Sequence, residues 1–348
     1  MKENKLSGIK QPAFFTNTRS ILLLLLLFVL LYIAFLGYRP LFFPDETRYA
    51  EIAREMIVTD DYVVPRLNEI PYLSKPPLGM WLVSLSISLL GKTSFAARLP
   101  SALAVGMTAF LIFLIVSRYA KERFTALLSG GAFLTAGLAL AVGTTCILDG
   151  FLTLLVTGGL ACFFFAYLSK DLKNRLFLLF LFGLFLGLSF LVKGFLAFVL
   201  PAIVIVPFLI WEKNAKKILT LPWIPLATAV IIIAPWALMI ASREVGFWDH
   251  FVFTEHLQRF MGSELSPKQA DPFWYYLPVL VGEWFPWTVL LVSAFIGMKE
   301  IGLKDPLVRF LFLWLVMPFL LFSASGLIKV WSIFLLTCHL TDILIRIP

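Results

Sequence analysis

Repeated apolar runs of about twenty residues limit what this chain can fold into. The first run extends from Arg19 to Tyr38, and similar runs recur along the whole sequence. A helix needs roughly 20 apolar residues to cross the hydrocarbon core of a bilayer, and about 17 to 25 are tolerated. Backbone polar groups in lipid must be bonded within the protein. The sequence therefore predicts an all-α, polytopic transmembrane helical bundle.

We predict ten spanning segments, the last of them weak because it carries His339, Asp342 and Arg346. The segments are Arg19–Tyr38, Leu99–Ser117, Phe124–Val142, Phe151–Leu168, Leu176–Val192, Phe195–Trp211, Leu219–Ala241, Tyr275–Gly297, Pro306–Phe322 and Val330–Pro348. The apolar stretch Pro77–Leu90 is too short to cross comfortably, so we expect an interfacial or re-entrant helix there. We interpret residues 1–348 as a single transmembrane domain.

Composition agrees with a membrane protein and excludes other classes. Only 14% of the residues are charged, whereas soluble domains carry roughly 25%. The net charge of +8 could suggest nucleic-acid binding, but the basic residues form short clusters between apolar runs, which is how membrane proteins fix their orientation. We expect membrane lipids and no nucleic acid as partners. Cys146, Cys162 and Cys338 lie in apolar stretches and predict neither a disulfide nor a metal site.

Alternate loops are basic, and this pattern predicts the two sides of the bundle. Residues 118–123, 170–175 and 213–217 carry lysines and arginines with few acids, which places these loops in the cytoplasm. The loops on the other side include 39–98 and 242–274, which are long and carry both signs of charge. We expect these two outer loops to form the active-site face.

The first outer loop opens with the charged stretch FPDETRYAEIAREM, from Phe43 to Met56. Pro44 followed by acids predicts the start of a helix, and helical spacing places Asp45, Tyr49 and Ile52 on one face. One interpretation is an amphipathic helix whose charges are simply hydrated at the membrane surface. However, acids outnumber basic residues seven to five over residues 39–75, whereas an anionic membrane surface favours lysine and arginine.

Lys75 lies in the segment PYLSKPP, where the prolines prevent a regular helix. They hold Lys75 at the entry to the short apolar helix. A lysine at this position can snorkel to lipid phosphate or bind one specific phosphate. Spacing alone does not separate these two readings.

Several short motifs follow one another along nearly the whole chain. They are Asp45-Glu46-x-x-Tyr49, Lys75-Pro76, Ala97-Arg98-Leu99-Pro100, Asp149, Lys193-Gly194, Glu255-His256-x-x-Arg259-Phe260, and Pro272–Pro278 leading into Pro286-Trp287. In this order they resemble the bacterial aminoarabinose transferases (ArnT-like), which belong to the GT-C superfamily of integral-membrane glycosyltransferases together with the protein O-mannosyltransferases. Each motif is weak alone, and the resemblance depends on their order and sidedness.

The resemblance implies a GT-C type bundle that spans the bacterial inner membrane and carries out its reaction on the outer face. There, a sugar would move with inversion from a polyprenyl-phosphate carrier to a lipid (lipid A-like), protein or other glycan acceptor. It implies a catalytic role for Asp45, which would stabilise an oxocarbenium-like state and accept a proton from a hydroxyl acceptor. Asp149 is the second candidate acid. For both residues, the alternative is capping a helix.

The resemblance also implies how the leaving phosphate would be held. Lys75 and Arg259 are the main candidates, because lysine offers a point charge and arginine a bidentate fork. Arg48 and Lys193 are further candidates, although Lys193 could simply snorkel to the interface. We expect supporting roles for four more residues: Glu46, Tyr49, Glu255 and His256.

A divalent metal ion near His256 is a weaker alternative. In ArnT-like proteins the matching histidine lies near a bound metal, together with an acid just before the Lys-Pro pair. This chain has Ser74 at that place, and Glu69 is a substitute that the sequence leaves open. Structural zinc sites need more ligands than these, so we expect no required cofactor.

The end of the chain departs from the family pattern. After Phe322-Ser-Ala-Ser, relatives continue with Lys-Leu-Pro and a tyrosine, whereas here Val330 and Trp331 follow Lys329. The sequence therefore suggests a truncated product without the usual C-terminal spans and soluble domain. An inactive or non-catalytic relative is one alternative function, and a lipid-linked sugar binding or transport protein is another. Polar residues gathered on one face disfavour transport.

Overall fold

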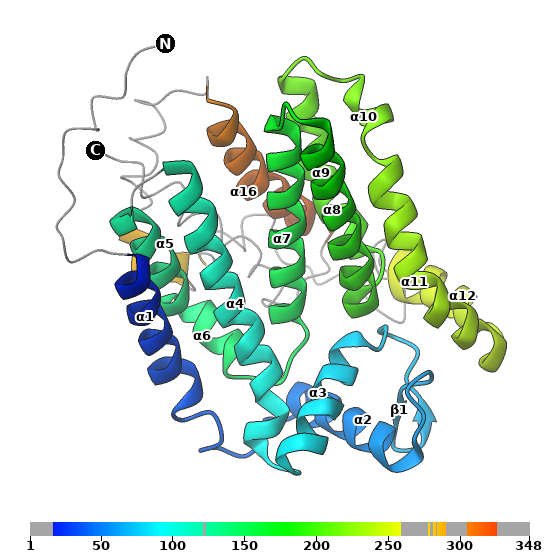
Figure 1. Ribbon diagram of the computed structural model, residues 1–348. Coiled ribbons are helices and arrows are strands. Elements are labelled where there is room, and N and C mark those ends of the chain that lie inside the picture. The colour runs from blue at the N-terminus through cyan, green and yellow to red at the C-terminus, as the bar shows by residue number, and fades with distance from the viewer. Residues whose placement is uncertain are drawn as a thin grey trace.

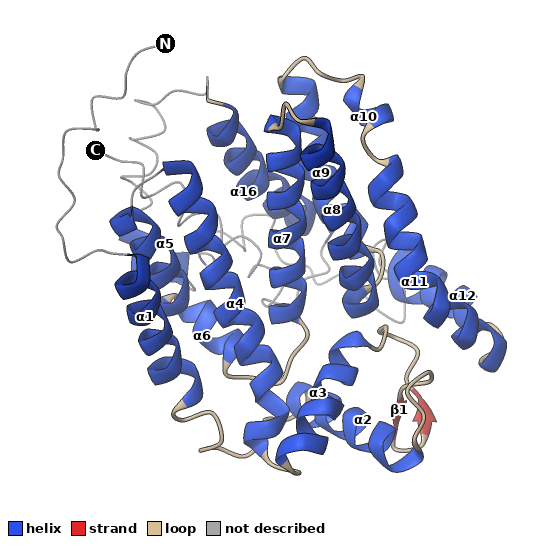
Figure 2. Cartoon of the chain, in the orientation of Figure 1, coloured by secondary structure: helices blue, strands red, loops and turns tan. Residues whose placement is uncertain are grey.

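The computed structural model describes residues 17–120, 123–258, 278, 281–282, 284–289 and 305–325. Most of the predicted span Tyr275–Gly297 and all of Val330–Pro348 lie outside these residues. The described residues form a bundle of long helices with a smaller layer of helices and a hairpin at one end (Figures 1 and 2).

The bundle is built mainly from helices at the predicted spans. Their bounds are α1 (Asn17–Phe28), α4 (Ser94–Ala120), α5 (Arg123–Thr135), α6 (Gly137–Gly143), α7 (Asp149–Leu168), α8 (Leu172–Lys193), α9 (Leu196–Trp211), α11 (Trp223–Arg243) and α16 (Pro306–Ser325). A π-helical turn, η2 (Val29–Ile33), extends α1, and a short helix, α10 (Lys217–Thr220), precedes α11. Among the described residues, five helices are long and apolar enough to cross a membrane. The predicted polytopic helical bundle is therefore confirmed.

The predicted span Phe124–Val142 consists of two helices, α5 and α6, which are long and apolar enough for a span only together and are bent by 64° at the break between them. Ala136, at the break, has an extended backbone conformation. The polar groups freed there find partners elsewhere: the Tyr32 hydroxyl donates to the carbonyl of Leu134 at 2.7 Å, and the amide of Gly137 donates to the carbonyl of Phe285 at 3.1 Å. Helix breaks at membrane depth are tolerated when the surrounding protein bonds the freed groups.

Two further spans are shorter than predicted. Helix α9 has 16 residues, slightly fewer than the roughly 17 that a span needs, and it begins after Gly194, whose φ is +69°. The apolar helical segment of α1 and η2 ends at Ile33, so the predicted span to Tyr38 is too long.

A layer beside the bundle contains the first outer loop. It consists of α2 (Asp45–Thr59), α3 (Leu78–Leu90) and the antiparallel hairpin of β1 (Arg66–Leu67) with β2 (Ile70–Pro71). The predicted helix start at Pro44 and the short apolar helix are both confirmed. The fully hydrated reading of α2 is wrong, because Glu46 and Glu55 are only 2% and 6% exposed.

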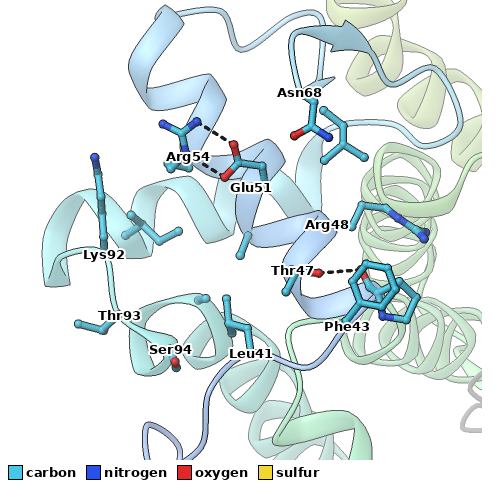
Figure 3. Close-up of a pocket in the computed structure, with 15 residues that line it drawn as sticks. Leu41, Phe43, Thr47, Arg48, Glu51, Arg54, Asn68, Lys92, Thr93 and Ser94 are labelled. Atoms are coloured by element: carbon cyan, nitrogen blue, oxygen red, sulfur yellow. Dashed lines mark hydrogen bonds and ion pairs between the residues drawn. The ribbon is translucent and has the colours of Figure 1, made fainter.

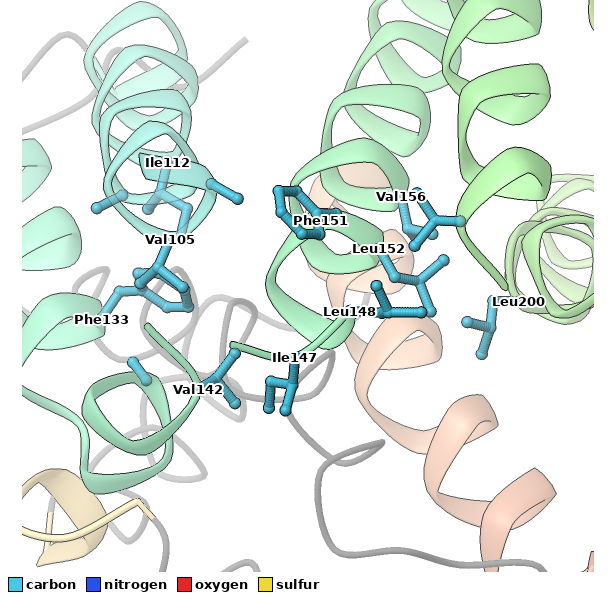
Figure 4. Packing of buried hydrophobic residues seen from close by; sticks show 14 of the residues in the cluster. Val105, Ile112, Phe133, Val142, Ile147, Leu148, Phe151, Leu152, Val156 and Leu200 are labelled. Carbon is cyan, nitrogen blue, oxygen red and sulfur yellow. The ribbon is translucent and has the colours of Figure 1, made fainter. Parts of the chain in front are cut away.

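Helix α3 lies directly against the start of α7. Gly79 of α3 packs on Leu148, and a side chain at position 79 would collide with that leucine. Leu148 also belongs to the large buried cluster that joins α4, α5, α6, α7 and α9 (Figure 4). The first outer loop is therefore anchored on the bundle core beside Asp149.

The first outer loop and the basic loops lie at opposite ends of the bundle, as the charge pattern predicted. The layer of α2 and α3 lies at the end of the bundle where α4 and α7 begin and where α8 ends (Figure 1). The basic loops 170–175 and 213–217 lie at the opposite end (Figure 1). The candidate site residues on these helices therefore share one end of the bundle.

Candidate active site

Glu46 is the structural centre of this end of the bundle. Arg98 donates to its carboxylate from Nε at 2.7 Å and from Nη2 at 2.9 Å, and Arg39 donates from Nη1 at 2.6 Å. The amides of Phe42 and Cys146 add bonds of 2.7 and 2.9 Å. Burial alone would raise the pKa of Glu46, but these hydrogen bonds outweigh it and lower the pKa to about 2. Glu46 is therefore a charged residue that joins the first outer loop, α4 and the α6–α7 loop.

Arg98 is a residue whose role sequence reasoning missed. It is completely buried and also donates to the carbonyls of Leu36, Arg39 and Pro40 at 2.9, 2.8 and 2.7 Å. A signal was present in the sequence, since an arginine in an apolar segment needs a partner. The arginine side chain has five N–H donors, so it can bond one carboxylate and several carbonyls at once.

Asp45 is the first residue of α2, directly before Glu46. Pro44, and not Asp45, occupies the N-cap position of this helix, and it forms no side-chain cap. The capping alternative for Asp45 is therefore wrong. Its carboxylate lies 3.3 Å from Nη1 of Arg48, and 27% of the side chain is exposed. Asp45 is thus paired with a cation and partly exposed.

Asp149 and Lys193 form the second charged pair of the site. Lys193 Nζ lies 2.7 Å from Asp149 Oδ1, and both side chains are largely buried. Leu148 occupies the capping position of α7, where no side-chain cap is formed, so the capping alternative for Asp149 is wrong. Because Lys193 is bonded to an acid inside the protein, it does not simply snorkel to the interface. The pair connects the start of α7 with the end of α8.

Tyr49 is a buried residue of α2. Burial raises its pKa well above the usual value, and electrostatic interactions with Tyr72, Asp149 and Asp45 act in the same direction. The environment of Tyr49 therefore includes both candidate acids.

Tyr72 is a second site residue that sequence reasoning missed. Burial is the main reason that its pKa is raised, while hydrogen bonds with Arg48 and Tyr49 oppose the shift. The electrostatic influence of Glu255 also raises the pKa of Tyr72. The backbone of Tyr72 is fixed by a 2.7 Å bond from its amide to the carbonyl of Pro65. Tyr72 thereby links the Asp45–Arg48 pair to the segment that carries Lys75.

Lys75 contacts the second outer loop through Glu255. Its Nζ lies 3.8 Å from Glu255 Oε2 and donates to the carbonyl of Ser74 at 3.0 Å. The Ser74 hydroxyl donates to Glu255 Oε1 at 2.8 Å. Glu255 belongs to the π-helical segment η3 (His250–Gln258), which continues α12 (Phe247–Asp249). The two outer loops therefore meet at Ser74, Lys75 and Glu255.

His256 packs against the turn that carries Lys193. Its Nδ1 lies 2.7 Å from the carbonyl of Phe251, and the ring also hydrogen-bonds to the backbone of Lys193. The ring packs edge-on against Phe195, with centroids 5.2 Å apart. Gly194 leaves the room for this contact, since a Cβ there would lie 2.8 Å from Nε2. Burial is the main cause that lowers the pKa of His256.

The donor set beside His256 does not fit a metal ion. No group of three histidine, cysteine or acidic side chains that could hold a metal occurs in the described part of the chain. Ser74 offers a hydroxyl instead of a carboxylate, and that hydroxyl already donates to Glu255. The amide of Glu69 is tied to Glu55 in the hairpin turn, and Glu69 does not join His256 in such a group. His256 uses Nδ1 for a backbone contact.

The described site residues form one connected cluster. Within the first outer loop, Asp45 pairs with Arg48, and Tyr72 bonds to Tyr49. Ser74 and Lys75 contact Glu255 of the second outer loop. His256, next to Glu255, bonds to the backbone of Lys193, whose side chain pairs with Asp149. Arg259 and Pro272–Tyr276 lie outside the described residues.

A groove of about 750 Å³ lies along another face of α2 (Figure 3). Arg48 and Phe43 form part of it, and Arg54, Glu51 and Lys92 also line it. Arg54 is bonded twice to Glu51, at 2.9 and 2.7 Å. Because Arg48 also pairs with Asp45, the groove reaches the partner of a candidate catalytic acid.

Residues 17–251 match the family model described as dolichyl-phosphate-mannose-protein mannosyltransferase. The chain belongs to this family. Within it, the sequence is 40% identical over 300 residues to the undecaprenyl phosphate-alpha-4-amino-4-deoxy-L-arabinose arabinosyl transferase of Shewanella sediminis. It is 41% identical over 304 residues to the protein of that name from Pectobacterium carotovorum. The alignments cover 86% and 87% of this chain and 54% of each relative, so the chain spans about half their length.

Solved structures support the same fold. ArnT from Cupriavidus metallidurans bound to undecaprenyl phosphate has a TM-score of 0.86 at 23% identity, covering 95% of this chain and 60% of that one. The archaeal oligosaccharyltransferase AglB from Archaeoglobus fulgidus has a TM-score of 0.60 at 14% identity, covering 96% and 50%. The predicted likeness to ArnT and the GT-C type fold are confirmed. The apolar helices and bacterial relatives indicate a multi-pass protein of the inner membrane.

Proposed function

We propose that this chain is the membrane part of a glycosyltransferase that moves a sugar from a polyprenyl-phosphate carrier to a lipid acceptor. The observation that carries this proposal is the meeting of charged segments that are far apart in the sequence. Glu255 contacts Ser74 and Lys75, and the neighbouring His256 packs against the Gly194 turn beside Lys193, the partner of Asp149. Segments far apart in the sequence bring two acids and several cations to one end of an apolar bundle. Ionisable groups at a membrane boundary are costly and usually functional.

The chemistry of sugar transfer from a phosphate carrier matches these groups. Charge develops at the anomeric carbon, and the Asp45 carboxylate would stabilise it. With a hydroxyl acceptor, Asp45 would also accept the proton, whereas an anionic phosphate acceptor needs no general base. Lys75 would balance the growing negative charge on the leaving phosphate. Asp149 holds Lys193 near the same place, which provides a second cation.

The relatives suggest the nature of the substrates. Their names specify undecaprenyl phosphate as the carrier and 4-amino-4-deoxy-L-arabinose as the sugar, and we propose the same class of donor here. The groove beside α2 would admit the head group of an anionic lipid such as lipid A, because its lining contains three basic side chains and one acidic side chain. A protein acceptor is the second candidate, favoured by the description of the family.

We further propose that this end of the bundle faces the periplasm. The support is the basic character of the opposite loops, at 170–175 and 213–217. Cysteines introduced at exposed Asn68 and exposed Lys170 would test the orientation in intact cells. A membrane-impermeant maleimide should label position 68 and spare position 170, and the reverse labelling would overturn the orientation.

Direct transfer by the purified chain tests the function. The donor would be radiolabelled undecaprenyl phosphate-aminoarabinose, offered with lipid A in mixed micelles, and the measurement would be label in lipid A. Asp45→Asn should lower transfer by about 10²-fold or more. Asp60→Asn is the matched control, because it makes the same change at an exposed aspartate that caps the other end of α2.

The outcomes separate this function from its rivals. Transfer unaffected by Asp45→Asn would remove Asp45 from the mechanism. Donor binding without transfer by the unmodified chain would favour a non-catalytic, sugar-binding relative. Absence of binding to any polyprenyl-phosphate sugar would overturn the proposal. Transport is disfavoured, because Asp45, Asp149 and Lys193 lie at the start of α2, the start of α7 and the end of α8, and these helix ends meet at one end of the bundle (Figure 1).

A further inference from the structure

An apolar cavity of about 260 Å³ lies in the half of the bundle nearer the basic loops, and its lining comes mainly from α8, α9, α10 and the start of α11. Leu179, Phe182 and Leu186 of α8 are buried and form its floor, since α8 packs against both α9 and α11. Gly183 of α8 lies so close to α11 that a Cβ there would stand 2.5 Å from the carbonyl oxygen of Pro225. The floor and the α11 wall are therefore held together by close helix packing.

The cavity opens sideways toward the bilayer. Val206 of α9 and Leu226 of α11 both line it and are 37% and 40% exposed. Ala202, one turn before Val206, also lines it and is exposed. In a bundle that spans a membrane, exposed apolar side chains at this depth contact lipid tails. An apolar chain can therefore enter the cavity directly from the bilayer.

The length of the cavity matches one leaflet. Its α9 residues run from Phe198 to Leu209, which is about 16 Å of helix at a rise of 1.5 Å per residue. The hydrocarbon core of a bilayer is about 30 Å thick, so one leaflet contributes about 15 Å. The cavity is therefore about as long as the acyl chains of a single leaflet are deep.

Among the described residues that line the cavity, Lys217 alone carries a charge. Its Nζ lies 4.3 Å from the centre of the Tyr167 ring, and the residue is partly buried. Glu212, the acid of the same loop, is paired with Arg309 at 2.7 Å. An aromatic ring holds an ammonium group in place without neutralising its charge. Lys217 therefore presents a positive charge at the end of the cavity nearest the basic loops.

We propose that this cavity binds one anionic glycerophospholipid, with an acyl chain along α9 and the phosphate at Lys217. The proposed orientation of the bundle places this lipid in the cytoplasmic leaflet. Anionic lipids of that leaflet attract basic segments, and basic pockets between membrane helices on the cytoplasmic side bind their head groups. The apolar lining and the single lysine together match the two parts of such a lipid.

This site differs from the one proposed for the sugar donor. Lys217 belongs to α10, which lies at the opposite end of the bundle from α2 and α3 (Figure 1). Lys75, the proposed cation for the leaving phosphate, comes shortly before α3. A lipid whose phosphate meets Lys217 therefore has its head group in the other leaflet from the proposed reaction.

Lipid binding by the whole chain in detergent tests the proposal. After bound lipid is removed, melting temperatures would be measured while phosphatidylglycerol or phosphatidylcholine is titrated. Phosphatidylglycerol should raise the melting temperature, because a ligand of the folded state stabilises that state by mass action. Native mass spectrometry should show one phosphatidylglycerol bound per chain. Phosphatidylcholine, whose head group has no net charge, should require about a fivefold higher concentration for the same rise.

A substitution at Lys217 tests the contact with the head group. Lys217→Gln should raise the half-saturating concentration of phosphatidylglycerol about fivefold, the effect of one basic residue on an anionic lipid, and leave that of phosphatidylcholine unchanged. Lys173→Gln is the matched control, because Lys173 is an exposed lysine of the other basic loop and does not line the cavity. Each rise is compared with the melting temperature of the same variant without lipid, so a change in basal stability is not counted as lost binding.

A bulky side chain at the opening tests the place of the acyl chain. Ala202→Trp should remove the saturable rise in melting temperature with both lipids, because the indole ring would occupy the cavity. Ala227→Trp is the matched control, since Ala227 is exposed on α11 and lies outside the lining.

Three results would overturn the proposal. The first is equal binding of phosphatidylglycerol by Lys217→Gln and the unmodified chain, and the second is saturable binding that survives Ala202→Trp. The third is displacement of phosphatidylglycerol by undecaprenyl phosphate, which would show that the cavity holds the tail of the sugar donor. Sugar transfer is measured separately, so loss of this lipid site leaves the proposed function standing.

Discussion

Glu46 and Arg98 form a buried, two-pronged ion pair, with N–O distances of 2.7 and 2.9 Å between residues from the first outer loop and α4. Removing one member of a buried pair leaves the other as an uncompensated charge, which costs about 3–5 kcal/mol. We expect Glu46→Ala to lower the melting temperature strongly in detergent. Glu51→Ala is the control, because the exposed Glu51–Arg54 pair is worth at most about 1 kcal/mol. Equal effects of the two substitutions would refute a structural role for Glu46.

Acid should destabilise the chain partly through Glu46. Its pKa is about 2 in the folded chain, compared with an ordinary value of 4.5. Between these values the unfolded chain binds more protons, so the stabilisation is present above about pH 4.5 and is lost as the pH falls toward 2. Melting temperatures measured from pH 7 to pH 3 should fall more steeply for the unmodified chain than for Glu46→Gln. Parallel curves would contradict the lowered pKa.

The Asp149–Lys193 pair allows structure and catalysis to be separated. Asp149→Asn and Lys193→Ala should each lower the melting temperature, because each leaves a largely buried charge without its 2.7 Å partner. The double exchange Asp149→Lys with Lys193→Asp should recover part of that stability. Transfer activity should stay low in the exchanged variant if the acid is needed at position 149. Recovery of both properties together would assign the pair a purely structural role.

Gly194 should tolerate a side chain poorly. Its φ is +69°, and a Cβ would lie 2.6 Å from Phe251 and 2.8 Å from His256. Gly246 has a similar φ of +81° with nothing within 4 Å, so Gly246→Ala reports the backbone strain alone, about 1–2 kcal/mol. Urea or thermal unfolding should show a larger loss for Gly194→Ala than for Gly246→Ala. If the losses are equal, the packing of His256 on this turn is not tight.

Tyr32 should stabilise the broken helix. Its hydroxyl is the donor to the carbonyl of Leu134, two residues before the bend at Ala136. Tyr32→Phe should cost about 1–3 kcal/mol, since it leaves a buried carbonyl without that donor. Tyr38→Phe is a suitable control because Tyr38 is 90% exposed. A melting temperature that is unchanged by Tyr32→Phe would show that another group satisfies Leu134.

Local signals explain what could be predicted from the sequence. Pro44 and Pro77 mark the starts of α2 and α3, because proline suits the beginning of a helix. The apolar runs predict most of the bundle, because lipid demands helical backbone. The bend at Ala136 could not be predicted, since its freed groups are bonded by Tyr32 and Phe285, which are distant in the sequence.

The charged residues of the site could be predicted from the sequence, but most of the contacts between them could not. Asp45, Asp149 and Lys193 stand out, because charged residues are rare beside apolar runs. Tyr72 gave no such signal, because its place beside Arg48 and Tyr49 depends on the hairpin. The contact between Glu255 and Ser74 could not be predicted either, since Ser74 lies in the other outer loop.

The Glu46 cluster has a consequence for how this family can diversify. One carboxylate fastens the backbone at Phe42, the helix that carries Arg98 and the loop at Cys146, and Asp45 is its immediate neighbour in the chain. The place of Asp45 at the end of the bundle is thus set by its neighbour, which is bonded to three separate parts of the chain. Residues elsewhere in the outer loops can therefore change without moving Asp45.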